Sequence, residues 1–113
     1  MKVEVLKLGE PTENGRIYDP ETTTLKDDSG YVYAFDHDDD FQDLTKIIAA
    51  YSLAAIEDGT IVAHVQRLNT PLAQVTNLME MDYFSQGYGE YDPETGVVSN
   101  FIMTSIGAFP KNY

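Results

Sequence analysis

The stretch that decides the fold prediction is Phe84-Ser85-Gln86-Gly87-Tyr88-Gly89, which leads through a Pro93–Gly96 turn into a β-branched run. Residues 83–91 and 97–109 are rich in aromatic and β-branched side chains, so we expect two strands around this turn. Ser85 stands next to glycine-rich sequence, a setting typical of a small turn. The stretch therefore predicts paired strands with a serine in a Gly-flanked turn, a place where a serine hydrolase can hold its nucleophile.

Upstream, shorter segments predict further strands and one helix. Alternating or β-branched patterns indicate strands over residues 3–8, 31–35 and 60–68. Residues 41–57 place apolar side chains at three- and four-residue spacing, which is typical of an amphipathic helix. An aspartate at 39 or 40 is suited to cap its N-terminus, and Asp58-Gly59 is expected to end it.

A second helix is expected after residue 69. Thr70 is a good helix cap and Pro71 suits the first helical position. Its apolar face would consist of Leu72, Val75, Leu78 and Met79. The predicted fold is thus one α+β domain over residues 1–113: a mostly antiparallel sheet or partly closed barrel with two helices.

Composition limits the classes of function. The chain has 113 residues, 19 acidic against 7 basic side chains, and a net charge of -12. Such a charge disfavours direct binding to nucleic acid and to anionic membranes. The chain has no cysteine, which excludes disulfides and thiolate metal sites. It has no apolar run of about 20 residues and no signal-peptide pattern, so we expect a soluble protein made in the cytoplasm.

A few residues carry chemistry suited to catalysis. Ser85 is the candidate nucleophile and His37 its candidate general base, because a serine hydroxyl needs a group that takes its proton. Gly87 and Gly89 would let the backbone approach an oxyanion closely. The acidic run 36–40 lacks the spacing of a calcium-binding loop, so we expect no metal ion and no cofactor.

In its order of local motifs, the chain resembles the capsid-maturation (prohead) serine proteases of tailed bacteriophages, relatives of the herpesvirus assembly proteases. The motifs are Asn14-Gly15-Arg16 after the first strand, His37, the strand over residues 59–65, Leu68-Asn69-Thr70-Pro71, and Ser85-Gln86-Gly87-Tyr88-Gly89. The resemblance implies a core of that family, and by analogy with its herpesvirus relatives it assigns His64 to orient His37.

Departures from the family pattern favour a degenerate relative. Gln86 stands where the family has an arginine, a donor whose loss costs about a hundredfold in rate or more. His37 lacks the glycine, glutamate and proline around the family's histidine, and residues 104–109 contain no acid. We therefore expect a small phage-encoded pseudoenzyme, in the host cytoplasm or the virion, that binds a capsid or scaffold protein or itself.

Two other functions stay open at this point. One is an active capsid-maturation peptidase that uses Ser85 and His37. The other is an acidic inhibitor of a host defence or DNA-binding protein, since a net charge of -12 suits a basic groove on another protein. Solubility alone is the simpler interpretation of that charge.

Overall fold

The structure is a computed structural model that describes residues 1–34 and 44–111. Strands make up most of it, and its helical segments are short. The strands are β1 (Lys2–Lys7), β2 (Ile17–Tyr18), β3 (Thr24–Leu25), β4 (Gly30–Ala34), β5 (Ile47–Glu57), β6 (Thr60–Arg67), β7 (Met81–Tyr91) and β8 (Val97–Pro110). The helical segments are η1 (Leu44–Lys46), α1 (Pro71–Gln74) and η2 (Leu78–Glu80).

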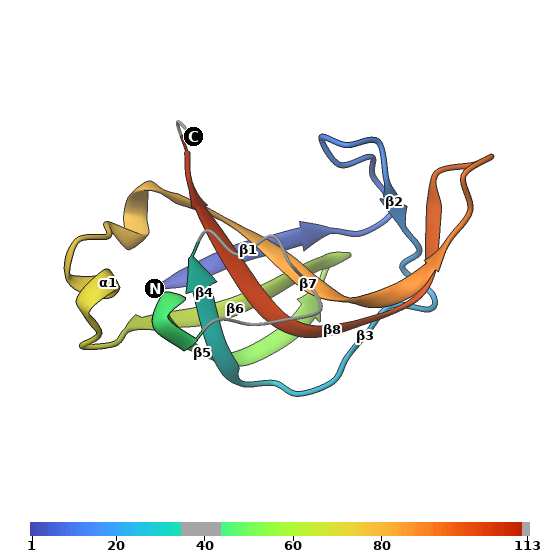
Figure 1. Ribbon diagram of the computed structural model, residues 1–113. Helices are drawn as coiled ribbons and strands as arrows, with labels where there is room; N and C mark the ends of the chain where they lie inside the picture. Colours follow the sequence, from blue (N-terminus) through green and yellow to red (C-terminus); the bar gives the residue numbers. More distant parts are fainter. Residues whose placement is uncertain (35–43, 112–113) are drawn as a thin grey trace.

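The long strand β8 is the central strand of the sheet and pairs with four other strands (Figure 1). On one edge it pairs antiparallel with β7, and along the other it pairs in parallel with β2, β3 and β4. From β4 the sheet continues through β5 and β6 to β1, and each of these pairs is antiparallel. Segment 17–34 therefore runs beside β8 although most of the chain separates them in sequence.

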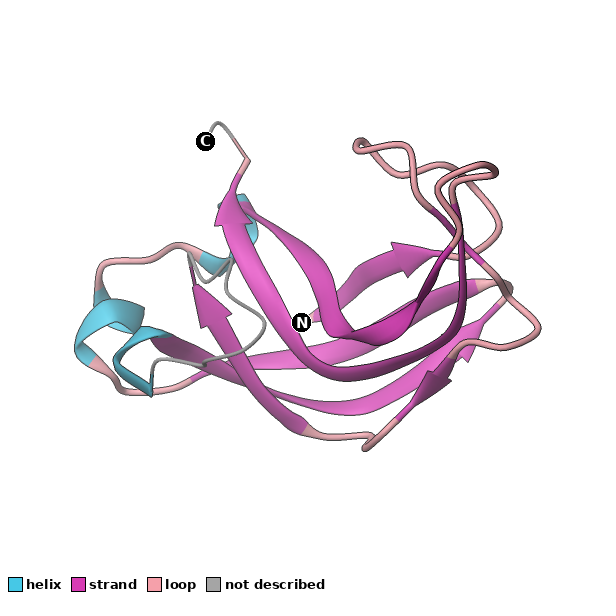
Figure 2. Cartoon of the chain, turned by 45° about the vertical axis from the view of Figure 1, so that its right-hand side comes forward, coloured by secondary structure: helices cyan, strands magenta, loops and turns pink. Residues whose placement is uncertain are grey.

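The sheet curls into a half-barrel (Figure 2). Among the described residues β1 pairs only with β6 and β7 only with β8, and these two strands contact each other without forming a ladder. The core contains side chains from most of the long strands. The largest of the fully buried side chains are Ile48, Ile61, Met103, Ile106 and Val32.

The prediction of an α+β domain with two helices is wrong, because the predicted helix 41–57 is strand β5 from Ile47 onward. One interval of the helix-like spacing has a local cause. Leu53 is an extra residue opposite β6 and has a φ of 53°, and such a bulge shifts the alternation of a strand by one residue. Buried Tyr51 and Ala54 are therefore three residues apart, as they would be on one face of a helix.

Asp58-Gly59, which was expected to end that helix, is the two-residue turn between β5 and β6. Glu57 pairs with Thr60, and the two turn residues have φ values of 50° and 76°. Positive φ at both positions defines a type I′ turn, which fits the twist of a hairpin and favours the pair Asp-Gly. The turn pairs β5 with β6, and β4 pairs with the other edge of β5, so ladders on both edges hold it as a strand.

The second predicted helix is a single turn. Its start is confirmed: Thr70 Oγ1 accepts a hydrogen bond from the Ala73 N–H at 3.2 Å, and Pro71 is the first helical residue. The helix ends at Gln74, however. Val75 and Met79, expected on its apolar face, are 81% and 75% exposed. A good cap thus starts the turn, but no packed face continues it.

Candidate functional site

Ser85, the candidate nucleophile, lies in the middle of β7, where it pairs with Ile106 of β8. The expectation of a Gly-flanked turn around it is therefore wrong. Ser85 is half-buried and alternates with Phe84 and Gln86, so it shares the face of β7 that carries Tyr83. Tyr83 packs against the core, and the Ser85 hydroxyl makes no hydrogen bond with the described part of the chain.

Gly87 and Gly89, the candidate oxyanion glycines, leave room for the neighbouring strand. A Cβ atom on Gly87 would lie 1.9 Å from the carbonyl oxygen of Ile102, and one on Gly89 would lie 2.8 Å from Cγ1 of Val98. The register between β7 and β8 shifts at both positions. The close approach of β8 therefore requires glycine at both positions whether or not an oxyanion binds, and the oxyanion role stays a prediction.

Gln86 and Ser105 form a buried polar pair that the sequence analysis missed. Both residues are 4% exposed, they face each other across the β7–β8 ladder, and the Ser105 hydroxyl donates to Gln86 Oε1 at 2.7 Å. The Thr104 hydroxyl also donates to the backbone carbonyl of Gln86 at 3.3 Å. Gln86, the residue that departs from the arginine of the resembled motif, thus makes a buried hydrogen bond between β7 and β8.

The second candidate catalytic residue, His37, lies outside the described residues. The pairing of Ser85 with His37 therefore stays a prediction.

His64, which the resemblance assigned to orient His37, lies on β6. It is exposed and stands between buried Ala63 and Val65, so it lies on the outer face of the sheet. Its cross-strand neighbours are Lys2 and Ser52. The structure does not bring His64 together with Ser85, which lies on another strand and on the face of Tyr83.

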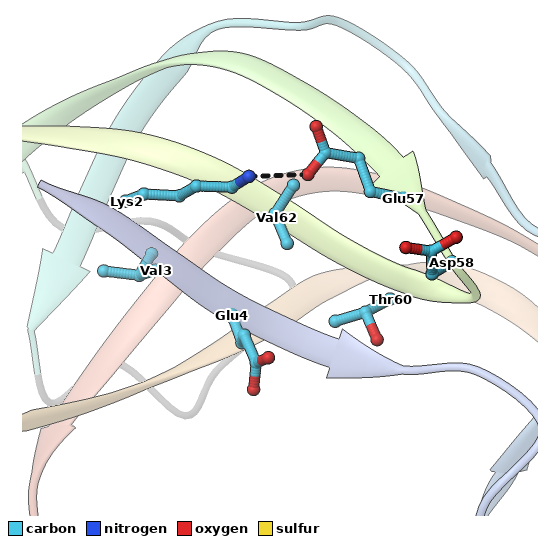
Figure 3. Close-up of a pocket in the computed structure, with 7 residues that line it drawn as sticks. All are labelled: Lys2, Val3, Glu4, Glu57, Asp58, Thr60 and Val62. Carbon is cyan, nitrogen blue, oxygen red and sulfur yellow. Dashed lines mark hydrogen bonds and ion pairs between the residues drawn. The ribbon is translucent and has the colours of Figure 1, made fainter.

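One surface hollow, of about 380 Å³, lies at the β5–β6 turn beside β1 (Figure 3). It is lined by Lys2, Val3, Glu4, Glu57, Asp58, Thr60 and Val62. Lys2 Nζ reaches Glu57 Oε2 at 2.7 Å, and the side chains of Glu4 and Asp58 point away from this ion pair. The hollow therefore lacks a convergent set of polar groups for a reaction.

A second hollow, of about 320 Å³, lies between the starts of β1 and β7. It is lined by Met1, Val3, Glu4, Leu78, Met79, Met81, Asp82, Tyr83 and Lys111, which include three of the four methionines of the chain. The Tyr83 hydroxyl donates to the Leu78 carbonyl at 2.9 Å. Burial raises the pKa of Tyr83 to about 12, against a smaller lowering effect of Arg67. Tyr83 is therefore a neutral hydrogen-bond donor at physiological pH.

The dominant feature of the described surface is its uncompensated negative charge. Every described aspartate and glutamate except Asp19 is exposed, and Lys2–Glu57 is the one ion pair within residues 1–34 and 44–111. No Lys, Arg or His occurs between Arg67 and Lys111, so the β7–β8 hairpin carries only acidic charges. These carboxylates are dispersed: no group of three potential metal ligands forms in the described part of the chain.

Comparison with protein-family models, curated proteins and solved structures finds no significant match. The resemblance to the prohead proteases therefore stays a prediction. No helix within the described ranges is long and apolar enough to cross a membrane.

Proposed function

We propose that this chain is a non-catalytic binding protein whose acidic surface receives a basic protein partner. The observation that carries the proposal is the uncompensated charge: the sequence has 19 acidic side chains against 7 basic ones, every described aspartate and glutamate except Asp19 is exposed, and one ion pair forms among the described residues. Unpaired surface carboxylates attract a basic partner over about 10 Å at 0.1 M salt and accelerate its association.

The described site geometry supports binding more than catalysis. Ser85 lies within a strand and His64 lies on the opposite face of the sheet, while the glycines that follow Ser85 are required by close strand packing. The resemblance of the sequence to prohead proteases suggests a capsid or scaffold protein as the partner. A basic host protein is the other partner class that the charge suits.

Affinity capture with a salt gradient tests the proposal. The immobilised chain is incubated with a lysate of its producing cells at low salt, and bound proteins are eluted with increasing NaCl. We expect a basic protein that elutes by about 0.5 M NaCl, where the screening length falls to about 4 Å. A polyglutamate resin of matched charge identifies proteins held by ion exchange alone. A specific partner that is retained unchanged at 1 M NaCl would contradict the proposal.

A fluorophosphonate probe tests the competing peptidase function separately. The binding proposal predicts no covalent labelling of the folded chain. Labelling that disappears in Ser85→Ala would show an activated serine and would replace this proposal with the peptidase function.

A further inference from the structure

The two strands with a free edge differ in how they discourage pairing with another chain. β1 carries Lys2, Glu4 and Lys7 as exposed charges, and its Val5 is an extra residue opposite β6. Edge charges and bulges are the devices by which natural sheets block the addition of a further strand. The start of β1 also borders the hollow beside β7. The free edge of β1 is therefore protected.

The far half of β7, residues Gly87–Tyr91, has less of this protection, because Glu90 is its one charged side chain. It pairs only with β8 among the described residues, and it contains no proline and no lysine. The hairpin does have bulges, but their extra residues belong to β8: Thr104 at one, and Asn100 with a φ of 54° at the other. β7 itself continues without an inserted residue, so we expect its outer backbone N–H and C=O groups to keep the alternation of a strand edge.

Apolar side chains stand beside this row. Tyr88 is 61% exposed, and its cross-strand neighbour Ile102 is also exposed. Tyr91 is exposed as well, with the guanidinium of Arg16 at 5.2 Å from its ring centre. When a peptide adds to a sheet edge, backbone hydrogen bonds supply affinity and such side chains supply specificity.

The charge of the hairpin indicates what kind of chain would pair with this edge. Glu90, Asp92 and Glu94 are exposed on or just beyond this half of β7, and Arg16 is the basic group seated on it. A second copy of the chain would bring the same carboxylates and a further net charge of -12 to the interface. A segment with lysine or arginine at its ends and apolar residues between them complements both the charge and the tyrosines.

Resting on the proposed function, we propose that Gly87–Tyr91 is the docking edge, and that the basic partner adds one extended segment to it as a new strand. The added strand would pair with the free backbone groups of β7. Its apolar side chains would contact Tyr88 and Ile102, and its basic side chains would face Glu90 and the hairpin tip.

A synthetic peptide, Lys-Val-Thr-Val-Thr-Val-Lys, tests the proposal by amide hydrogen exchange of the full chain at low salt. We expect the peptide to slow exchange of amides within Gly87–Tyr91 by about fivefold or more at saturation, because added ladder bonds protect them. The same peptide with N-methylated valines cannot form that ladder and should give no protection. Tyr88→Lys should abolish the protection, because it places a positive charge at the edge.

Tyr31→Lys is the matched control variant. Tyr31 is 51% exposed and lies on β4, which has β5 and β8 on its two edges, so this variant changes the net charge equally and should retain protection of β7. Binding that protects other residues would overturn the docking edge and leave the acidic binding function standing. Absence of binding at millimolar peptide would also contradict the docking-edge proposal. The proposed acidic binding function is tested separately, by the capture of a basic partner that elutes with salt.

Discussion

At the scale of residues, the hydrogen bond between Gln86 and Ser105 matters because both side chains are buried. In Ser105→Ala the Gln86 Oε1 atom loses this donor, although the Gln86 side chain stays buried. Removing one partner of a buried hydrogen bond costs about 1–3 kcal/mol. We therefore expect the free energy of unfolding of Ser105→Ala, measured by urea denaturation, to fall by that amount.

Ser85→Ala is the matched control for Ser105→Ala. Ser85 lies on the same hairpin, is half-buried, and its hydroxyl makes no hydrogen bond with the described residues. We expect its free energy of unfolding to change by about 0.5 kcal/mol or less. Equal losses in the two variants would contradict the role assigned to the buried pair.

Tyr83 predicts a loss of stability in alkali. Burial raises its pKa from 10.0 in the unfolded chain to about 12 in the folded chain. The folded state therefore holds this proton more tightly, so its contribution is complete below pH 10 and is lost as the pH rises towards 12. Between pH 9 and pH 11.5 we expect the free energy of unfolding of Tyr83→Phe to fall by about 1–2 kcal/mol less than that of the unaltered chain. Urea denaturation at each pH measures this difference.

Tyr31→Phe serves as the control for Tyr83→Phe, since it removes the hydroxyl of an exposed tyrosine. A change of the alkaline profile that occurs in Tyr83→Phe and is absent from Tyr31→Phe would assign the loss to the buried hydroxyl. If Tyr83→Phe retained the full alkaline loss, the source of that loss would lie elsewhere.

The residues of the candidate site were predictable from the sequence only in part. A strand over residues 83–91 is confirmed, because its aromatic content marks it. Ser85 lies within this predicted strand, and the additional expectation of a turn around it was wrong because glycine next to serine is equally typical of a turn. The pairing of Gln86 with Ser105 depends on the register of two strands, which the bulges of β8 shift by a residue each. No local pattern encodes that shift.

At the scale of elements, β5 contains a strained bulge. Leu53 has a φ of 53° and is 67% exposed. The left-handed region costs an ordinary residue about 1–2 kcal/mol, and an exposed leucine loses little packing when it is replaced. We expect Leu53→Gly to raise the free energy of unfolding by about 0.5–1 kcal/mol in urea denaturation, after the flexibility of glycine is subtracted.

Leu53→Ala isolates the cause of that gain. It removes the same exposed side chain but keeps a Cβ atom in the left-handed region, so it should give no gain. An equal gain from alanine and glycine would attribute the effect to the exposed side chain, and not to the backbone.

The longer strands outside β5 were predictable, whereas the two-residue strands β2 and β3 were not predicted. β1, β4, β6 and β8 lie where alternating or β-branched patterns placed them. β5 was mistaken for a helix because its bulge imitates helical spacing, and because Asp58-Gly59 is a plausible helix end as well as a type I′ turn. The ladders to β4 and β6 decide between these alternatives, and they connect residues that are distant in sequence.

At the scale of the whole molecule, a net charge of -12 opposes compactness through self-repulsion. Salt screens this repulsion and so stabilises the folded chain. Salt also weakens attractive ion pairs, but the described residues form only one, and it is exposed. We expect the melting temperature to rise by several degrees between about 0.02 and 0.5 M NaCl, where a gain of 1 kcal/mol corresponds to about 4–8 °C.

The triple variant Glu10→Gln, Glu13→Gln, Glu94→Gln tests the cause of that rise. These carboxylates are exposed, and their side chains form no hydrogen bond or ion pair with the described residues. The variant should melt at a higher temperature in low salt and respond less steeply to NaCl. A melting temperature that falls with salt in the unaltered chain would show that attractive charge pairs dominate.

The pairing of β8 with both neighbouring and distant segments has a consequence for how the chain folds. The β5–β6 and β7–β8 hairpins join neighbouring segments and can close within about 10 μs. By contrast, Ile17 pairs with Val97 and Val32 with Ile106, contacts that require very large loops to close first. Proteins dominated by such non-local contacts fold in milliseconds to seconds. We therefore expect the docking of segment 17–34 onto a finished β7–β8 hairpin to be the slow step by which this chain reaches its native state.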